Sequence, residues 1–493
     1  MKSSFTLIFL LLVCFQFTAQ SLRGRVVEAS NQKGIPFVTV QLGDNYGVIS
    51  NAEGYFVLQR KTTSDETPIL ISSMGFESVE ILLKDFEENQ IISLKPATYE
   101  LDEVLLFDKQ LTAEEILEKF KANAKENHQL SNAKVQVFLR SNDDYKAETF
   151  EIDIKKASYL SRSERKEMNA NMEALGNKIT SKSSKSYRER LLNIYAFEDT
   201  LANEYQKALN LINRETTFDT EDIQEQVFFG LMKSLKSPYS FKVKTGIIPI
   251  DKDVSLNELI EDIEKDKLKL PDTVYHSKSW RSENYKNKAT RFNKDFLTST
   301  KHYNYELMGV TRVYGEPCYH IKFSPNPWRW KGKYVGNLYI NTRDFGMVSY
   351  NYDLDEGEKA MNVNLKFVLG IKINSFVDSG FLIFTRNSEN TYYPRYIKQT
   401  DGSYAYISRS LSFKENNPDR SQRKQLKLAF ELEYNLMETA EYVGIEYQSI
   451  SPDLLNSLSF DKYILIDEVE KYDTNYWKDY NIIEATEAIK TYK

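Results

Sequence analysis

Near the N-terminus, apolar and polar residues alternate over short stretches, and glycine-containing turns separate these stretches. Residues 37–42 alternate as a strand with one buried face does, and residues 55–58 form another short apolar run. Turn signals lie at residues 34–36 and 51–54, where glycine can adopt the positive φ that other residues resist. This spacing predicts about seven short strands over residues 21–106, and therefore a small β-sandwich.

A helix is predicted between this sandwich and the rest of the chain. Thr112 and Glu115 have the spacing of a capping box, and the apolar residues that follow recur at helical spacing. We expect a helix over about residues 113–126, within a linker at residues 107–130.

Residues 131–300 mix helical and strand patterns. Strands are predicted at residues 135–140 and 150–154, and an amphipathic helical run at residues 256–265. Residues 161–190 are rich in Ser, Lys, Glu and Asn. That composition predicts an exposed, Lys/Ser-rich helix or loop inserted into this mixed α/β region.

From Tyr303 onward the alternation becomes regular and favours an antiparallel meander over residues 301–440. A C-terminal tail with a helix is expected over residues 441–493. The predicted fold class is mainly β with α: a seven-stranded sandwich, then an α+β domain with a large antiparallel sheet, for which a half-barrel is one arrangement. Strands of this sheet are expected at residues 305–310, 318–323, 336–341, 347–350, 362–374, 381–386, 392–399, 403–414 and 425–436.

The N-terminus has the order of a cleavable signal peptide. Lys2 precedes an apolar run at residues 5–13, and residues 18–20 supply the short polar and small residues before a cleavage point. We predict a signal peptide over residues 1–20 and a mature chain that starts near Ser21. Such a chain would lie in the periplasm or at the outer membrane.

Two other fates of this segment are less favoured. Acylation of Cys14 would follow a lipoprotein signal, but Val13 is a poor residue in the position before such a cysteine. An uncleaved anchor needs roughly 20 apolar residues to span the hydrocarbon, and this run is shorter. Peripheral membrane association stays open.

Composition narrows the class of protein. After cleavage Cys318 is the one remaining cysteine, so an intramolecular disulfide is impossible and core burial must stabilise the fold. Net charge is −6, with 65 basic and 71 acidic residues well mixed, which gives no footprint for nucleic acid. The 32 tyrosines and 28 phenylalanines favour β-structure.

Four blocks in the first segment, at residues 34–40, 50–56, 75–76 and 101–104, form one pattern. This pattern resembles the carboxypeptidase regulatory-like, transthyretin-like domain that is common at the N-termini of envelope proteins in Bacteroidetes-type bacteria. The resemblance covers residues 24–104. It implies an accessory sandwich in a cell-envelope protein.

The family name suggests a peptidase, but the catalytic module is missing from the sequence. A zinc carboxypeptidase uses a His and a Glu three residues apart, together with a distant His. The residues three places after the four histidines are Ser131, Ser279, Tyr305 and Phe323. We therefore expect no metal site, no cofactor and no catalytic residue of this type.

The rhythm of residues 301–440 is similar to that of lipoprotein-carrier half-barrels, in which a curved antiparallel sheet wraps a helix. Residues 472–481 resemble the terminal segment of Bacteroidetes proteins that carry the same N-terminal sandwich. The first resemblance implies a site for an apolar ligand, and the second implies no particular function.

Two clusters of reactive side chains have a simpler explanation than catalysis. Carboxylates at residues 353, 355, 356 and 358 surround Gly357, which could suggest calcium, but their spacing fails the EF-hand pattern and a solvated hairpin is favoured. Cys318 and His320 share a strand face and could form a thiol and its base. A buried free cysteine is usually inert, so we favour a core residue.

Two tryptophans form the best candidate for binding. Trp328 and Trp330, beside Pro325 and Pro327, face the same way on an extended chain and could contact a sugar, a lipid or a partner surface. Rings at such a place more often cap the end of a sheet.

The sequence thus predicts an exported, non-enzymatic envelope protein with an accessory or binding role toward a protein partner, a lipid or a glycan. One alternative is a periplasmic carrier of an apolar ligand or lipoprotein, which needs a sheet lined by apolar side chains and a helix over it. Another is a hydrolase of envelope polymers, which needs a cleft with convergent carboxylates or an activated thiol. Catalytic residues, metal ligands and cofactors are predicted to be absent.

Overall fold

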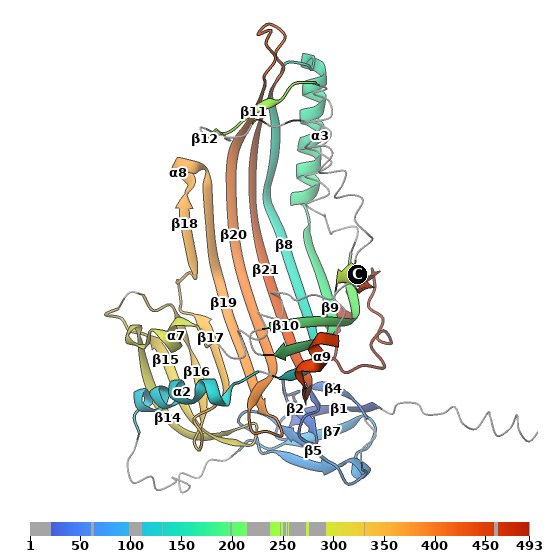
Figure 1. The fold of residues 1–493 in the computed structure, drawn as a ribbon, viewed down its shortest axis with the longest axis vertical. Coiled ribbons are helices and arrows are strands. Elements are labelled where there is room, and N and C mark those ends of the chain that lie inside the picture. Colours follow the sequence, from blue (N-terminus) through green and yellow to red (C-terminus); the bar gives the residue numbers. More distant parts are fainter. Residues whose placement is uncertain are drawn as a thin grey trace, which may run out of the picture.

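The computed structural model describes residues 21–60, 64–97, 111–130, 132–197, 200–213, 237–246, 248–249, 253, 255, 273–275, 292–329, 331–457 and 462–492. In this part of the chain a small sandwich lies at the base of a tall, curved sheet (Figure 1). The predicted leader with Cys14, the helical run at residues 256–265 and the block at residues 101–104 lie outside the described residues.

The N-terminal β-sandwich is confirmed. One of its sheets has the order β4-β1-β7 and the other has the order β3-β2-β5-β6. Valine, leucine, isoleucine and phenylalanine side chains from both sheets fill the space between them, as alternating strands dictate. The strands are β1 (Ser21–Glu28), β2 (Thr39–Leu42), β3 (Gly47–Ile49), β4 (Tyr55–Gln59), β5 (Pro68–Ser72), β6 (Val79–Leu82) and β7 (Gln90–Leu94), with a 3-10 turn η1 (Leu83–Asp85).

The tall sheet is built on four long antiparallel strands: β19 (Ile371–Arg386), β20 (Tyr392–Glu415), β21 (Gln425–Ser449) and β8 (Ala133–Ala157). The predicted strands at residues 135–140 and 150–154 are therefore parts of a single strand. The meander prediction also ended too early, because β21 continues past residue 440. The charged middle of β8 belongs to this strand because β21 pairs with β8 over its whole length and satisfies its backbone.

Shorter strands extend the sheet on both sides, and its path runs β14-β15-β16-β17-β19-β20-β21-β8-β9-β10-β23. These are β9 (Ser183–Phe197), β10 (Thr200–Ile212), β14 (Tyr303–Val313), β15 (Glu316–Pro325), β16 (Tyr334–Asn341), β17 (Met347–Leu354) and β23 (Asp467–Val469). Off the path lie β11 (Phe241–Thr245), β12 (Ile248–Pro249) and β18 (Met361–Leu365), while β13 (Thr273–Tyr275) pairs with β22 (Tyr463–Leu465).

Helices cover parts of the sheet. The capping box is confirmed, since the Glu115 amide donates to Thr112 and the Thr112 amide donates to Glu115, at the start of α2 (Ala113–Asn127). The predicted insertion at residues 161–190 is the helix α3 (Arg162–Thr180) and then the first half of β9, so it is only partly a helix. The short helices are α7 (Asp295–Thr298), α8 (Lys366–Leu369), α9 (Pro452–Ser457) and α10 (Glu487–Lys490), with a 3-10 turn η2 (Thr300–His302).

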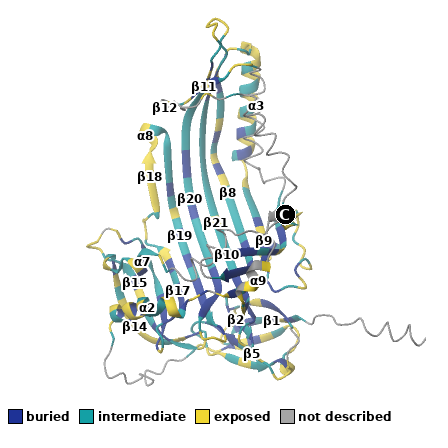
Figure 2. Ribbon diagram, viewed as in Figure 1, coloured by how far each residue is buried: buried dark blue, intermediate teal, exposed yellow. Residues whose placement is uncertain are grey.

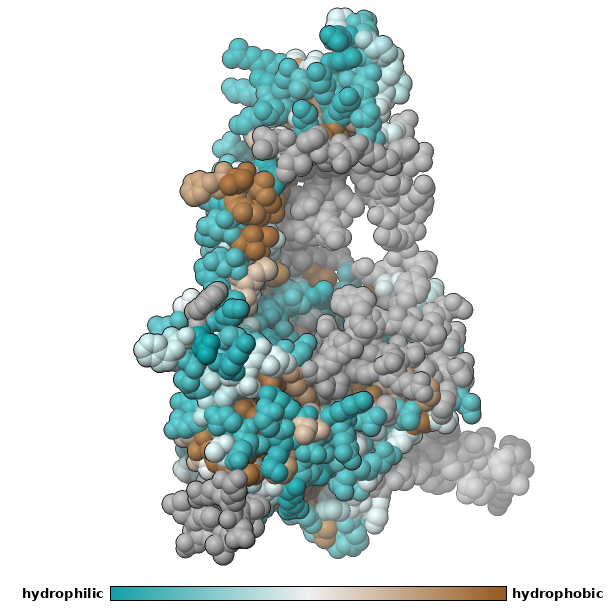
Figure 3. Space-filling view, turned by 60° about the vertical axis from the view of Figure 1, so that its left-hand side comes forward, coloured by the Kyte–Doolittle hydropathy of each residue, from teal (hydrophilic) through white to brown (hydrophobic). Residues whose placement is uncertain are grey.

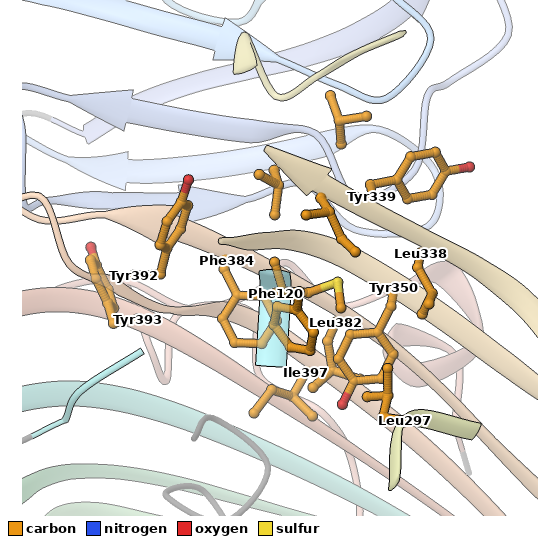
Figure 4. Packing of buried hydrophobic residues seen from close by; sticks show 14 of the residues in the cluster. Phe120, Leu297, Leu338, Tyr339, Tyr350, Leu382, Phe384, Tyr392, Tyr393 and Ile397 are labelled. Carbon is orange, nitrogen blue, oxygen red and sulfur yellow. The ribbon is translucent and has the colours of Figure 1, made fainter. Parts of the chain in front are cut away.

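The base of the tall sheet is buried on both faces. Ile383 and Tyr396 join the core of the sandwich, whereas their neighbours Leu382 and Ile397 join a second core with Phe120 of α2. Figure 4 shows this second core, in which rings from β17, β19 and β20 surround Phe120. Because successive strand residues point to opposite faces, one set of strands serves two cores.

Two buried arginines fasten the parts together. Arg395 donates from Nη1 to the carbonyls of Gly47 (3.2 Å) in the sandwich and Gly444 (2.6 Å) in β21. Arg140 pairs with Glu189 at 2.6 Å and donates to the Ile483 carbonyl at 3.0 Å. The C-terminal segment is thus held between the sandwich and the sheet, since the Gln59 amide donates to Asn481 Oδ1 at 2.7 Å on the sandwich side.

A buried histidine makes the fold sensitive to acid. His128 Nε2 accepts a hydrogen bond from the Met347 amide at 2.9 Å, and the ring stacks on Tyr392. Burial lowers the pKa of His128 from its usual 6.5 to about 3. The unfolded chain therefore takes up a proton on His128 at a higher pH than the folded chain does.

We predict that stability falls as the pH is lowered from 6.5 toward 3, by up to about 1.4 kcal/mol per pH unit from this residue alone. His128→Gln keeps an acceptor for the Met347 amide but cannot titrate. Urea unfolding at pH 7 and pH 5 measures the effect. The wild type should lose more stability than the variant over this interval, and equal losses would show that His128 is not the group responsible.

Candidate functional site

The upper part of the tall sheet separates apolar from polar side chains by simple alternation. Along β21, leucine and aromatic residues at 426, 428, 430, 432, 434 and 436 alternate with polar residues at 427, 431, 433 and 435. A strand with this pattern places one kind of side chain on each face of the sheet.

The register between strands extends this separation across the sheet. Leu365, Ile371, Ile407, Leu432 and Phe150 follow one another across β18, β19, β20, β21 and β8. A second row, two residues along, contains Val363, Ile373, Ala405, Tyr434 and Ala147. We call these ten residues the apolar face, which is about 19 Å wide at the usual spacing of strands.

The opposite side carries a row of polar and charged groups. Tyr404 donates from its hydroxyl to Glu433 Oε1 at 2.6 Å, and the Lys372 ammonium lies 5.1 Å from the ring of Tyr404. Burial and this hydrogen bond raise the pKa of Tyr404 to about 12. These groups interact with one another across neighbouring strands.

One edge of the apolar face is covered by helix α3. Ile179 of α3 is buried with Ala147 and Phe150, and a Cβ at Gly176 would clash with the Phe150 carbonyl. The helix is also tied to the strand edge, because the Ile154 amide donates to Asn169 Oδ1 at 2.9 Å. The sequence therefore places a helix against one side of an apolar sheet, as the carrier alternative required.

The other edge of the apolar face, at β18, is exposed. Burial decreases from the base of the sheet to its upper part (Figure 2). In β18, Val363 is 38% exposed and Leu365 is 41% exposed. Apolar side chains gather over β18 and α8 in the space-filling view (Figure 3). Exposed apolar patches of this kind mark sites of interaction.

Two pockets lie between the sandwich and the polar side of the sheet. The larger, of about 460 Å³, is lined by residues that include Phe37, Tyr314, Phe381 and Lys398. The smaller, of about 180 Å³, contains Glu441 and Glu484. The smaller pocket falls below the range of roughly 300–1,000 Å³ that ligand sites occupy, and its volume does not suit the polymer substrate of the hydrolase alternative.

Packed or hydrogen-bonded neighbours surround Cys318 and His320, the predicted thiol and base. Cys318 is buried, and burial raises the pKa of its thiol. His320 Nε2 lies 2.8 Å from Asn337 Oδ1, and the His320 ring stacks on Tyr339. Among the described residues no group of three His, Cys, Asp or Glu side chains is placed to hold a metal ion.

The structure describes one of the two candidate tryptophans. Trp328 is 90% exposed in the turn between β15 and β16, where its amide donates to Asn326 Oδ1 at 3.0 Å. It therefore does not cap the sheet. Trp330 lies outside the described residues.

Sequence reasoning missed the apolar face. A single strand was expected over residues 362–374, whereas β18 and β19 form a hairpin joined by α8, and Gly370 ends this helix with a φ of 65°. The signal that could have found the turn was Gly370 after a short apolar run. The rows themselves could not be found, because they join strands far apart in the sequence.

Comparison with known proteins identifies the first segment. Residues 22–106 match the family model of the CarboxypepD_reg-like domain, which confirms the resemblance for this part of the chain. A search of the curated proteins finds no match. Among the described residues, no helix has the length and apolar character needed to cross a membrane.

Two solved structures are similar over longer stretches but at low scores. MucB in complex with MucA(peri) covers 69% of this chain and 100% of its own, with 8% identity and a TM-score of 0.16. A Bacteroides fragilis protein, described as membrane-associated and of unknown function, covers 86% of this chain and 98% of its own, with 10% identity and a TM-score of 0.13.

The exposure of Trp328 generates a prediction. Trp328→Ala should change the free energy of unfolding by less than about 0.5 kcal/mol, because the ring is in solvent. A buried capping ring would cost about 3 kcal/mol or more. Thermal unfolding of the variant and the wild type decides between these, and a large drop in Tm would show that the ring is packed.

Proposed function

We propose that this protein is an exported, non-enzymatic binding protein of the cell envelope that carries an apolar ligand on the apolar face. The observation that supports this most is the pair of apolar rows across β18, β19, β20, β21 and β8, covered by α3 at one edge and open at the other. A carrier needs this combination, because a fully covered sheet would leave no room for a ligand.

The chemistry of the face favours acyl chains over a peptide or a glycan. Of its ten side chains, Tyr434 alone has a group that can form a hydrogen bond. A peptide or a sugar placed there would lose hydrogen bonds to water without replacing them, whereas an acyl chain loses none. Contact with the apolar face stabilises a bound acyl chain by about 25 cal/mol for each Å² of apolar surface removed from water.

Export is proposed from the leader and the sandwich together. Residues 1–20 have the order of a signal peptide, and the regulatory-like domain that follows at residues 22–106 fits an envelope location. The sandwich would then act as the accessory base that fixes the tall sheet through Arg395.

Matched variants on one strand test the apolar face. Val363→Asp with Leu365→Asp places two carboxylates on the apolar face, whereas Asn362→Asp with Asn364→Asp places them on the opposite side of β18. Titration with a fluorescent fatty acid should show that the first pair weakens binding by on the order of tenfold or more. The second pair should bind like the wild type.

All four positions are exposed, so both double variants should keep the Tm of the wild type. If the two variants bind the fatty acid equally well, the apolar face is not the site. Absence of any binding to the wild type would also contradict the proposal.

Export has its own test. N-terminal sequencing of the protein from its native envelope should give a start near Ser21. An intact Met1, or an acylated Cys14 at the N-terminus, would contradict the proposed processing.

A further inference from the structure

The hairpin at the open edge of the apolar face ends in two strongly exposed apolar residues. Phe367 is 99% exposed and Val368 is 73% exposed, both in α8 between β18 and β19. Burying a phenylalanine or valine side chain is worth about 1.5–3 kcal/mol relative to leaving it in water. A folded protein that leaves the ring of Phe367 and the methyl groups of Val368 in solvent does not gain this stabilisation.

The tip is not a loose loop. The Ser408 amide donates to the Gly370 carbonyl at 2.8 Å, and the Gly370 amide donates to the Lys366 carbonyl at 3.0 Å. A Cβ at Gly370 would clash with the Ser408 carbonyl, so the turn lies directly against β20. The Lys366 ammonium lies 3.8 Å from the centre of the Tyr406 ring. These contacts hold Phe367 pointing into solvent.

The charge of the hairpin differs from that of the whole protein. The chain has a net charge of −6, yet residues 359–377 contain Lys359, Lys366 and Lys372 and no acidic residue. Lys366 lies in the tip itself and Lys372 lies on the strand that follows it, whereas Lys359 precedes β18 at the far end of the hairpin, next to Glu358. An apolar tip with Lys366 and Lys372 beside it matches the surface of an anionic bilayer. The tip would enter the headgroup region while the ammonium groups contact the phosphates.

The tip is also continuous with the apolar face. Leu365 precedes α8 directly and heads the row that passes through Ile371 and Ile407 to Leu432. A bilayer against the tip would therefore meet the open edge of this row.

We propose that the β18-α8-β19 hairpin is a membrane-docking element that inserts Phe367 and Val368 into the interface of an anionic lipid bilayer. This deepens the proposed function, because docking would bring the open edge of the apolar face to the source of acyl chains. The docking itself does not depend on the face carrying a ligand.

Co-sedimentation of the mature protein with vesicles tests the docking. The wild type should bind vesicles of phosphatidylglycerol and phosphatidylethanolamine, and Phe367→Asp with Val368→Asp should weaken this binding by on the order of tenfold or more. Ile91→Asp is the matched control, since Ile91 is another exposed apolar residue, on β7 of the sandwich. Replacing Lys366 and Lys372 by glutamine should weaken binding to these vesicles but not to phosphatidylcholine vesicles.

A probe at the tip reports its environment directly. Phe367→Cys can be labelled with an environment-sensitive fluorophore, because Cys318, the other cysteine of the mature chain, is buried. Its emission should shift to the blue when anionic vesicles are added, while a label at Ile91→Cys should not respond. A label at residue 367 that stays in water would overturn the proposal.

The failure of docking is distinguishable from the failure of ligand binding. Phe367→Asp with Val368→Asp should still bind the fluorescent fatty acid in solution, where Val363→Asp with Leu365→Asp should not. Vesicle binding by the tip variant equal to that of the wild type would overturn the docking, as would no vesicle binding by the wild type.

Discussion

The alternation of side chains along the four long strands is the constraint on which the rest of the structure depends. At the base, both faces of these strands are buried, one against the sandwich and one against α2. Higher up, the same alternation continues where neither of these elements reaches, and it leaves one polar and one apolar face. The period of a strand thus produces a closed core and an open apolar surface in a single sheet.

The buried arginines Arg395 and Arg140 hold the base of the tall sheet in place, although one face of its upper part is not covered along its whole width. Arg395 is fully buried and donates to carbonyls of both the sandwich and β21, while Arg140 joins β8 to the C-terminal tail. Removing either guanidinium would leave buried carbonyl groups without their donors, so these contacts are costly to break. The base is therefore a rigid foundation for the tall strands.

Local signals in the sequence predicted local structure well. The turn at residues 51–54, where Gly54 has a φ of 86°, and the capping box at Thr112 were each readable from a few neighbouring residues, and both are confirmed. The length of β8 was not readable, because its charged middle depends on pairing with β21, more than two hundred residues away. The apolar face has the same origin, since its rows exist only once the register between β8, β20 and β21 is known. Trp328 could be selected from the sequence because tryptophan is a rare residue type. Leu365 and Phe367 are common apolar types, and only their exposure in the structure distinguishes them.

The most direct measurement of the central claim is photo-crosslinking of the mature protein with a palmitate that carries a diazirine near the end of its chain, followed by mapping of the adducts by mass spectrometry. The account predicts adducts on the apolar face, at residues such as Leu365, Ile373, Ile407 and Leu432, that are competed by unlabelled palmitate. Adducts confined to the pocket beside Phe37, or spread over the surface without competition, would contradict it.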